Sequence, residues 1–568
     1  MQSALQILQK YWGHSNFRKK QDKIINSILE NKDTLAILPT GGGKSICYQI
    51  PALMMDGICI VVSPLISLMN DQVEKIKKKG IKAIALTSEM NYREIDIALT
   101  NCIFGNFKFL YLSPERLQNE LVKKKISEMK INLIAIDESH CISEWGHNFR
   151  PSYRNISEIR KIKPKAPILA LTATATATVV KDIQNNLNFK ARNVIKSSFT
   201  RKNISYLVYK EENKNKKLLN ILNKVKGSAI IYTKSRNDCE KLNKLLIKNN
   251  ISSNYYHGGM SISERNKRQF SWNNSETKVM VATNAFGMGI DKSNVRLVIH
   301  FHIPYNVESY YQEIGRAGRD EKESYAILLY NNIDVNQLEG FVELNYPKIS
   351  DIKDVYQKLA NYFHLAVNCG EEESFDFNIS EFCNKYKYNY IKVYNSLKYL
   401  EKEEYLKLIE IQNKFSRVKI KMELSELYKF QSNNSFLSPY IKLLLRSYSG
   451  LFDDFIMIDE NVLSARSKTT EKKITEILYR LDKLEVISYI SKKQGSKITY
   501  LQNRIENKHL QISEKKLIKR KESEIERMKY ILNYTTQNSV CRNKILLSYF
   551  DEVQENNCGK CDICRTKD

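Results

Sequence analysis

The sequence predicts an α/β protein with two tandem domains built on parallel sheets, then a helical, winged-helix-like region and a C-terminal cysteine module. From about residue 35 to 340, short apolar runs such as TLAIL, ICIVVS and VRLVIHF alternate with polar helical stretches. Runs that are apolar throughout are typical of strands buried on both faces, as in parallel sheets covered by helices. Beyond about residue 345, long charged segments follow, and four cysteines gather near the end. The predicted domains are 1–207, 208–345, 346–502 and 503–568.

The composition favours a polyanionic partner, because the 568 residues include 90 Lys and Arg against 63 Asp and Glu, a net charge of +27. Nucleic acid is the simplest such partner. The chain is also rich in Lys, Asn and Ile, which an AT-rich genome produces without selection for binding, so both explanations stay open. No apolar stretch approaches the length of a membrane span, and MQSALQILQKYWG lacks the apolar core of a signal peptide. We therefore expect a cytoplasmic protein without a membrane segment, and a nucleic-acid partner in a bacterial cell would place it on the nucleoid.

The segment LPTGGGKS at 38–45 follows a strand-like run and precedes the helical run ICYQIPALMM. Its glycines allow backbone amides to wrap a phosphate chain, and the helix N-terminus adds positive potential. Lys44 would reach the β- and γ-phosphates, and Ser45 would hold Mg²⁺. Leu38 stands where the usual motif has its first glycine, and a plain glycine turn is the alternative. The predicted ATP-binding residues of this loop are Thr40, Gly41, Gly42, Gly43, Lys44 and Ser45.

A pair of acids, Asp137 and Glu138, ends the apolar run at 131–136. In phosphate-loop hydrolases an acid at the end of such a strand holds Mg²⁺, and a further group orients the attacking water. We predict the first role for Asp137, together with Ser45, and the second for Glu138. Two acids at this position could instead simply cap the next helix, but the glycine loop favours nucleotide hydrolysis.

Four of the eleven cysteines follow the pattern C-x16-C-x2-C-x2-C near the end of the chain. Four thiolates at this spacing fit a tetrahedral, structural Zn²⁺ with no open position for chemistry. Redox-active cysteine pairs are the alternative. The other seven cysteines are isolated, and we expect them to be small core residues in a reducing compartment. The predicted zinc ligands are Cys541, Cys558, Cys561 and Cys564.

The region 346–502 combines helical segments with short strand-like runs. Apolar residues recur at helical spacing over 470–484, and two strand-like runs then flank the turn SKKQGSK at 491–497. A helix followed by a hairpin with a basic tip is the outline of a winged helix. An ordinary helical domain is about equally compatible with this pattern. The charged sequence of residues 503–535 predicts a helix or helical hairpin.

Taken in order, LPTGGGKS, IDESH, LTATAT and YQEIGRAGRD resemble the motifs of the RecQ family of DNA helicases. The resemblance covers roughly the first 345 residues and the C-terminal cysteines. It implies two RecA-like domains and an ATP- and Mg²⁺-dependent helicase with a structural zinc. It further implies loading on single-stranded DNA, movement 3′ to 5′, and unwinding of forked duplexes in recombination and repair. Family members commonly carry the zinc module directly after the second RecA-like domain, whereas residues 346–540 intervene here.

The resemblance also assigns residues that would recognise the base of ATP. WGHSNFRKKQ at 12–21 resembles the adenine-recognition segment of the family. In that segment His14 would lie against the adenine ring, Gln21 would hydrogen-bond the base edge, and Arg18 would assist. Without the resemblance, His14 would be taken for an ordinary surface residue.

QEIGRAGRD at 312–320 would supply the second domain's part of the nucleotide site. Gln312 would contact ATP, and a guanidinium aimed at the γ-phosphate would stabilise charge as an arginine finger does. Arg319 is the first choice for the finger and Arg316 is the alternative. The family often continues this motif with glycine, where Glu321 stands here. LTATAT at 171–176 would link the acid pair to the moving interface.

Contacts to the DNA backbone are expected from SPLISLMNDQ, SPERL, TKSR and HGGM, where hydroxyl, guanidinium and backbone amide groups can hold phosphates. The side chains predicted to take part are Arg116, Arg236 and His257. Each of them could instead be a structural cap or a surface charge.

The loop CISEWGHNFRP resembles the aromatic-rich loop of the family. Trp145 and Phe149 offer faces on which bases can stack, and Arg150 can bind phosphate or stack. His140 would lie on the short path from this loop to the acid pair. Buried core aromatics are the alternative, although the segment is polar and ends in proline. The chain departs from the common family pattern at two nearby positions, Ser139 and Glu144.

Two other functions remain compatible with the sequence. One is an RNA helicase or translocase of the DExH type, which the zinc cluster and the aromatic loop disfavour. The other is a non-catalytic DNA-binding scaffold, which the intact phosphate loop, acid pair and arginines disfavour. Comparing the stimulation of ATP hydrolysis by single-stranded DNA and by RNA would separate the first alternative from a DNA helicase.

Overall fold

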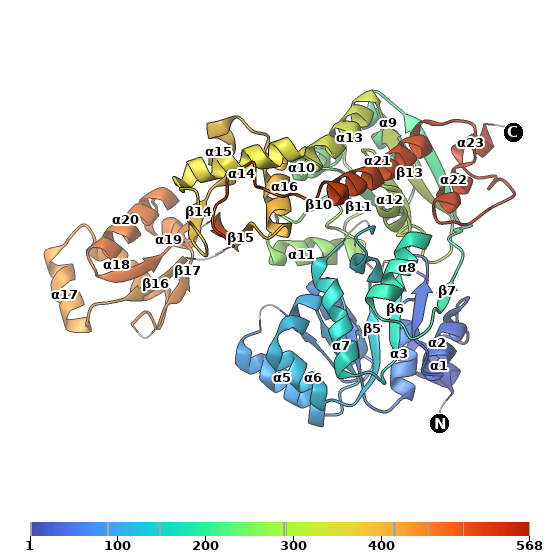
Figure 1. The fold of residues 1–568 in the computed structure, drawn as a ribbon, viewed down its shortest axis with the longest axis horizontal. Coiled ribbons are helices and arrows are strands. Elements are labelled where there is room, and N and C mark those ends of the chain that lie inside the picture. Colours follow the sequence, from blue (N-terminus) through green and yellow to red (C-terminus); the bar gives the residue numbers. More distant parts are fainter. Residues whose placement is uncertain are drawn as a thin grey trace. The chain divides into compact units, whose positions relative to one another are not determined.

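The computed structural model divides into two compact units, one of Met1–Gly340 with Arg520–Asp568 and one of Phe341–Lys519. The first unit contains two parallel sheets and the C-terminal cysteines, and the second contains two antiparallel sheets (Figure 1). In the described part of the chain, no helix combines the length and the apolar character needed to span a membrane. The structure describes residues 3–566 except 88–89, 147–148, 288–289, 291, 413–415, 453 and 492–493.

The first domain is a seven-stranded parallel sheet in the order β3-β4-β2-β5-β6-β1-β7. Its residues alternate between two apolar clusters, so that Leu35 and Ile37 pack in one and Ala36 and Leu38 in the other. Burial on both faces explains the uninterrupted apolar runs and confirms the predicted parallel sheet. The strands are β1 (Thr34–Ile37), β2 (Ile58–Val62), β3 (Ala83–Leu86), β4 (Phe109–Leu112), β5 (Ile131–Ile136), β6 (Ile168–Thr172) and β7 (Val194–Lys196). The helices are α1 (Ala4–Trp12), α2 (Gln21–Leu29), α3 (Ile46–Met54), α4 (Ile66–Lys77), α5 (Tyr92–Phe104), α6 (Glu120–Glu128), α7 (Ser157–Ile162) and α8 (Ala177–Asn186), with short 3-10 turns at Pro114–Gln118, Ser139–Ile142 and Pro151–Ile156.

The second domain is a six-stranded parallel sheet in the order β10-β11-β9-β12-β13-β8. Neighbouring residues again alternate between two clusters, as Ile230 and Ile231 do. The predicted domain boundary after residue 207 falls inside β8, which pairs along its whole length with β13. The strands are β8 (Ile204–Lys210), β9 (Ser228–Tyr232), β10 (Ser253–Tyr256), β11 (Val279–Ala282), β12 (Val295–His300) and β13 (Ser324–Tyr330). The helices are α9 (Lys214–Lys224), α10 (Arg236–Lys248), α11 (Ile262–Asn273), α12 (Val307–Ile314) and α13 (Asn332–Asn345).

The C-terminal module packs on the second domain through aromatic side chains. The hydroxyl groups of Tyr534 and Tyr310 lie 3.0 Å apart. Phe550 stacks on Phe199, which precedes β8, with ring centroids 4.5 Å apart. All four rings are buried, so the module and the second domain share one apolar core. The residues of the second unit separate these two parts in the sequence. Its helices are α21 (Glu514–Thr536), α22 (Arg542–Tyr549) and α23 (Asp562–Arg565).

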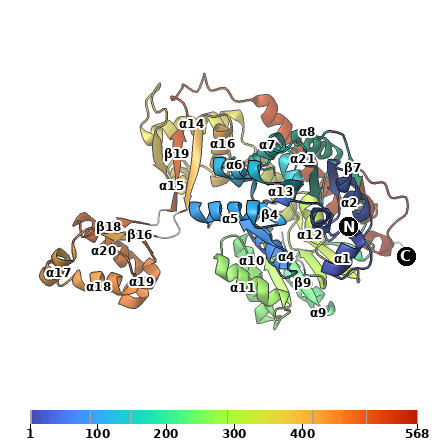
Figure 2. The ribbon, with the colours of Figure 1, turned by 90° about the horizontal axis from the view of Figure 1, so that it is seen from below.

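The second unit contains two three-stranded domains, one inserted into the other. The outer domain has the sheet order β14-β19-β15, and the inner domain, which lies between β15 and β19 in the sequence, has the order β17-β16-β18. Each has its own apolar core, and the helices of the inner domain gather with β16 and β18 in Figure 2. The outer elements are α14 (Ile349–Phe363), β14 (Ser374–Phe377), α15 (Ile379–Tyr386), α16 (Tyr390–Lys402), β15 (Leu406–Gln412) and β19 (Gln494–Tyr500). The inner elements are β16 (Ser416–Ile420), α17 (Leu424–Asn433), α18 (Ser438–Ser447), β17 (Ile456–Ile458), α19 (Glu460–Ser467), α20 (Glu471–Lys483) and β18 (Ile487–Ile490).

The hairpin predicted around SKKQGSK is wrong, although both of its strands exist. β18 pairs with β16, whereas β19 pairs with β14 and β15. Ile487 of β18 packs in the core of the inner domain, and Ile498 of β19 packs in the core of the outer domain. Alternation along a strand fixes which face is buried but does not specify the partner strand, so the local pattern could not separate the two sheets. Lys492 and Lys493 of the predicted turn lie outside the described residues.

Candidate functional site

A cavity of about 900 Å³ in the first unit is lined by both parallel-sheet domains. Each residue predicted to bind ATP or to take part in its hydrolysis lines this cavity, apart from Gly42. The first domain contributes His14, Arg18, Gln21, Thr40, Gly41, Gly43, Lys44, Ser45, Asp137 and Glu138. The second domain contributes Gln312, Arg316 and Arg319.

The glycine loop between β1 and α3 is held by the start of α2. Gly41 and Gly43 have φ values of +81° and +76°, which glycine adopts without a steric penalty. The buried Gln21 amide donates to the carbonyls of Gly42 and Gly43 at 3.2 and 3.0 Å, and the Arg18 guanidinium donates to the carbonyl of Gly41. A Cβ at Gly43 would lie 2.3 Å from Gln21 Nε2, so a side chain there would displace this amide. The predicted base-recognition residues therefore also shape the phosphate loop.

The acid pair follows β5 and faces the lysine of the glycine loop. Glu138 Oε1 lies 3.6 Å from Lys44 Nζ, and Glu138 has a φ of +46°, an uncommon conformation for a residue with a side chain. The pKa of Asp137 is raised to about 6. Burial is the largest cause and the charge of Glu138 adds to it, while the charge of Lys44 partly offsets both. A buried acid beside a second acid is a group that a bound cation would stabilise. Asp137 and Ser45 both line the cavity and could hold Mg²⁺ there.

Polar contacts run from the acid pair to the second domain through LTATAT. His140 Nδ1 lies 3.4 Å from Glu138 Oε2 and 3.0 Å from the Thr172 hydroxyl. The Thr172 hydroxyl accepts from the Thr174 amide at 3.2 Å, and the Thr174 hydroxyl accepts from the Gln312 amide group at 3.4 Å. His140, Thr172 and Thr174 are buried. These contacts give the predicted link a continuous path between the two domains.

The two candidate finger arginines have different surroundings. A Cβ on Gly41 would lie 3.2 Å from Arg319 Cγ, so this side chain rests against the glycine loop. Arg319 Nη1 also donates to the Ile290 carbonyl at 2.5 Å. Arg316 is buried and donates to the Gly287 carbonyl of its own domain. Of the two, Arg319 is therefore the one in direct contact with the opposite wall of the cavity.

Glu321 occupies the position at which the family often has glycine, and its φ of +64° lies in the left-handed region. Glycine adopts this conformation freely, whereas another residue bears a cost of about 1–2 kcal/mol. The loop after GRAGRD thus keeps a shape that suits glycine although the residue has changed.

Arg201 is a cross-domain residue that the sequence did not single out. It lies between β7 and β8, and its guanidinium donates to the Thr40 carbonyl at 3.2 Å in the glycine loop. The same group donates to the carbonyls of Ala317 and Gly318 at 3.0 and 2.9 Å. It therefore bridges the glycine loop and the arginine-bearing loop. A lone arginine outside any motif carries no sequence signal for this role.

The aromatic-rich loop connects the acid pair to the surface. Trp145 is half-buried against the main apolar cluster, and Phe149 is partly exposed. Arg150 donates to the Pro64 carbonyl of the SPLISL segment at 3.0 Å. At the far end of the loop, the Tyr153 hydroxyl donates to the Asp137 carbonyl at 3.1 Å. The loop therefore begins just after the acid pair in the sequence, and the chain that leaves it returns to Asp137 through Tyr153.

The three other side chains predicted to contact DNA differ in their exposure and in their contacts. Arg236 is exposed at the start of α10, and its guanidinium lies against Gly259 in the HGGM segment. Arg116 donates to a backbone carbonyl at 2.6 Å. His257 is buried and stacks on Tyr255 with ring centroids 5.6 Å apart. Of these three, Arg236 is the one that the structure leaves open to a ligand.

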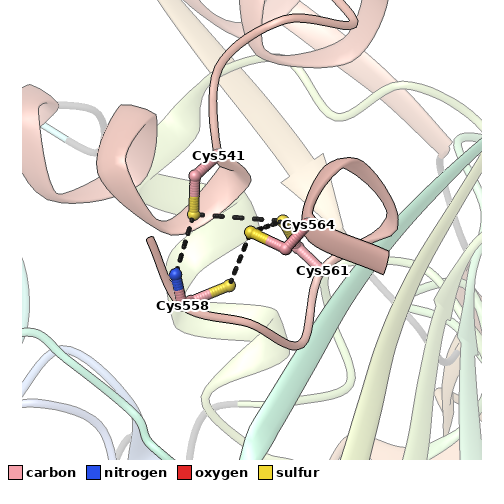
Figure 3. A group of neighbouring side chains, drawn as sticks. All are labelled: Cys541, Cys558, Cys561 and Cys564. Carbon is pink, nitrogen blue, oxygen red and sulfur yellow. Dashed lines mark hydrogen bonds between the residues drawn. The ribbon is translucent and has the colours of Figure 1, made fainter. Parts of the chain in front are cut away.

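The four C-terminal cysteines converge at one point (Figure 3). Their sulfur atoms lie within 4.8 Å of one another, with Cys561 Sγ 3.4 Å from Cys564 Sγ and 3.9 Å from Cys541 Sγ. Thiolates bound tetrahedrally to Zn²⁺ at about 2.3 Å would be about 3.8 Å apart. Cys541 precedes α22 and Cys561 precedes α23, so a bound metal would join the two helices. The donor set and its spacing fit a structural zinc ion.

Four family models match the chain in succession. A DEAD/DEAH box helicase model matches residues 18–183, and a helicase conserved C-terminal domain model matches 213–321. A RecQ helicase winged-helix domain model from Bacteroidota matches 418–491, and a RecQ zinc-binding model matches 497–565. The third match coincides with the inner domain of the second unit and confirms the predicted winged-helix-like region. The fourth match includes all four clustered cysteines.

Curated proteins and solved structures agree with these matches. The chain is 42% identical over 366 residues to the ATP-dependent DNA helicase RecQ of Bacillus subtilis (strain 168), covering 64% of this chain and 62% of that protein. It therefore spans about three fifths of that relative's length. It is 41% identical to the probable ATP-dependent DNA helicase RecS of the same strain, covering 63% of this chain and 73% of that protein. The crystal structure of the DUF1998 helicase MrfA bound to DNA has a similar fold, with a TM-score of 0.50 at 18% identity over 60% of this chain and 52% of that chain.

Proposed function

Because the chain belongs to the RecQ family of helicases, we propose that it is an ATP-dependent DNA helicase. It loads on single-stranded DNA, moves 3′ to 5′ and unwinds forked duplexes in recombination or repair. The observation that carries this proposal is the cavity in which the glycine loop and acid pair of one domain meet the arginines of the other. A site divided between two domains makes hydrolysis depend on their approach, and a translocating enzyme needs this dependence.

The chain's own residues supply most of the proposed hydrolysis. Lys44 and the amides of the glycine loop bind the phosphates, while His14, Arg18 and Gln21 recognise the adenine. Glu138 orients the attacking water and is held near Lys44 for this purpose. Arg319, in contact with the glycine loop, stabilises the charge that develops on the γ-phosphate, and Arg316 supports it.

Two metal ions complete the proposal. Ser45 and Asp137 would hold Mg²⁺, which would neutralise phosphate charge when it is bound. Asp137 is a buried carboxylate beside a second acid, and a cation bound there would offset this unfavourable burial and charge. Zn²⁺ is held by the four C-terminal cysteines, whose sulfur atoms lie within 4.8 Å of one another, and it has a structural role.

DNA binding reaches the acid pair through the aromatic-rich loop. Trp145 and Phe149 stack on bases, and Arg150 contacts phosphate. His140 and the threonines of LTATAT carry the resulting change to Gln312. The DNA backbone is held by Arg236, together with amides of the segments that contain Arg116 and His257. We place this activity in the cytoplasm, on nucleoid DNA.

The decisive experiment is an unwinding assay of the full chain with ATP and Mg²⁺ on 3′-tailed, 5′-tailed and forked DNA duplexes. We expect unwinding of the 3′-tailed and forked substrates and no unwinding of the 5′-tailed one. Unwinding of the 5′-tailed duplex alone would contradict the polarity. Unwinding of an RNA duplex in preference to all three DNA substrates would replace the proposal with an RNA helicase.

A further inference from the structure

Two arginines from distant parts of the chain converge on one carboxylate within the aromatic-rich loop. Glu144 Oε1 accepts from Arg154 Nη2 at 2.7 Å, and Glu144 Oε2 accepts from Arg520 Nη2, on α21, at 2.5 Å. The ring centre of Phe149 lies 5.1 Å from the guanidinium carbon of Arg154 and 6.0 Å from that of Arg520. The arrangement is an aromatic face flanked by two cations that share a single anion.

We propose that Arg154, Arg520 and Phe149 form a binding site for one nucleotide of single-stranded DNA, and that Glu144 occupies its phosphate position until a strand displaces it. This inference rests on the proposed function and deepens it, because it adds two arginines and a competing carboxylate to the DNA site in which Phe149 stacks on a base. A phosphodiester carries one negative charge and two free oxygens, as a carboxylate does. It therefore accepts hydrogen bonds from two guanidinium groups in the same way.

The surroundings of the three charged groups allow this exchange. Their side chains keep part of their solvent exposure, with 23% for Glu144, 19% for Arg520 and 47% for Arg154. Ion pairs with this exposure are weak and screened by salt, so neither contact is permanent. Phe149 is partly exposed beside them and provides a face for the base that follows the phosphate. A DNA strand offers a phosphate to the arginines and a base to Phe149, whereas Glu144 offers only an anion.

Glu144 nevertheless competes effectively, because it is attached to the same chain. A tethered group acts at an effective concentration of millimolar order, which a free strand must overcome. The acid therefore lowers the affinity of this site and keeps the aromatic-rich loop tied to α21 without DNA. Displacing it frees a loop whose far end donates to the Asp137 carbonyl through Tyr153. Arrival of a strand is thereby coupled to the acid pair.

The test uses the full chain and the fluorescence anisotropy of a labelled oligo-dT strand, without ATP, over a series of KCl concentrations. Glu144→Gln keeps the shape of the side chain and removes its charge. We expect this variant to bind the strand about 3- to 10-fold more tightly than the wild type, the factor for releasing one or two partly exposed ion pairs. A merely structural role for Glu144 would give weaker or unchanged binding.

Two companion variants isolate the cause. Glu94→Gln removes an exposed carboxylate that accepts from the Asn91 amide at 2.8 Å, and we expect less than about a two-fold change because no arginine is unmasked. Arg520→Ala should flatten the dependence of log affinity on log salt by about 0.7, the value for one phosphate contact on a single strand. In the Arg520→Ala background, the gain from Glu144→Gln should shrink.

The inference is overturned if Glu144→Gln, with an unchanged unfolding temperature, binds the strand no more tightly than Glu94→Gln. It is also overturned if its gain persists in full without Arg520. A wild type that binds oligo-dT as expected but never hydrolyses ATP would sink the proposed helicase and leave this site standing. A wild type that does not bind oligo-dT would contradict both.

Discussion

Helix α12 takes part in two junctions of opposite character. On one side Gln312 faces the nucleotide cavity and reaches Thr174 of the first domain through a hydrogen bond of 3.4 Å. On the other side Tyr310 and Tyr311 are buried against the C-terminal module, where Tyr311 meets the ring of Phe550 at 5.1 Å. One junction is polar and surrounds a cavity, and the other is aromatic and closed.

This difference indicates which parts move together. Separating buried aromatic rings costs several kcal/mol per side chain, whereas a long hydrogen bond beside a cavity is exchanged for water at little cost. The C-terminal module should therefore travel with the second domain, while the junction at the nucleotide opens and closes. The module also reaches the first domain through polar contacts, such as the ion pair of Arg520 with Glu144 and the hydrogen bond from the Ala177 amide to Asp551 at 3.1 Å, and these contacts belong to the exchangeable kind.

The strongest way to break the polar junction is to remove the phosphate-binding lysine. Lys44→Ala should abolish ATP turnover, because no other side chain of the glycine loop carries a positive charge to the phosphates. Binding of oligo-dT should persist. Steady-state phosphate release measures the first and anisotropy the second. Lys32→Ala, which alters an exposed lysine paired with Glu30 at 2.6 Å, is the control. Retained turnover in Lys44→Ala would remove the glycine loop from the nucleotide site.

The aromatic junction depends on a folded C-terminal module, which the zinc ion should hold together. Metal analysis of the wild type should find one zinc per chain, and Cys561→Ala should lose it together with the order of α22 and α23. Hydrogen exchange of these helices measures that order. Cys369→Ala, which changes an exposed cysteine outside the cluster, should retain the metal. A wild type that is free of zinc and equally stable would contradict the assignment.

Arg319→Ala should lower kcat by about 10³-fold, the size of effect associated with a finger arginine. The dissociation constant for ATP should change much less, because the phosphate loop and base-recognition residues remain. Rapid-quench kinetics and nucleotide binding measure the two quantities. Arg316→Ala in parallel sharpens the comparison, since Arg316 is buried within its own domain whereas Arg319 rests against the glycine loop of the other domain. A larger loss in Arg316→Ala than in Arg319→Ala would reverse the two roles.

Phe550→Ala should weaken the aromatic junction by about 3–5 kcal/mol, because it deletes a fully buried ring that stacks on Phe199. The unfolding free energy of the module, followed by hydrogen exchange, reports this change. Affinity for ATP should stay close to that of the wild type. Phe270→Ala removes a ring that is 64% exposed and should cost little. An equally small effect at Phe550 would show that the module is anchored elsewhere.

The smallest expected effect concerns the aromatic-rich loop. Trp145→Ala should reduce ATP hydrolysis stimulated by oligo-dT by about tenfold, the value of one lost stacking contact, and the basal rate by less. The two rates are compared in one steady-state assay. An equal loss in both would assign Trp145 to the core, against which it is half-buried.

Most residues that line the candidate nucleotide cavity could be named from the sequence, because short motifs mark them. Lys44 and Ser45 follow the glycines directly, and Asp137 and Glu138 follow a buried strand. A segment of a few residues therefore indicates both where each side chain lies and which role to expect for it. The parallel sheets were predictable for the same reason, since burial on both faces leaves uninterrupted apolar runs.

What could not be predicted depends on pairs of residues far apart in the chain. Arg520 meets Glu144 across 376 positions, and no short pattern marks either residue as a partner. The same holds for Arg201, which joins two loops by donating to backbone carbonyls. Every residue has a backbone carbonyl, so the sequence does not mark these acceptors. The misplaced hairpin has this cause too, because β18 and β19 are adjacent in sequence but complete different cores.

The most direct test of a split, strand-dependent nucleotide site is ATP turnover by the pure wild-type chain with and without oligo-dT. We expect slow hydrolysis alone and a rate at least about tenfold higher with the strand, because DNA must bring the acid pair and the arginines together. Hydrolysis that is absent in both conditions, or equally fast in both, would contradict the account.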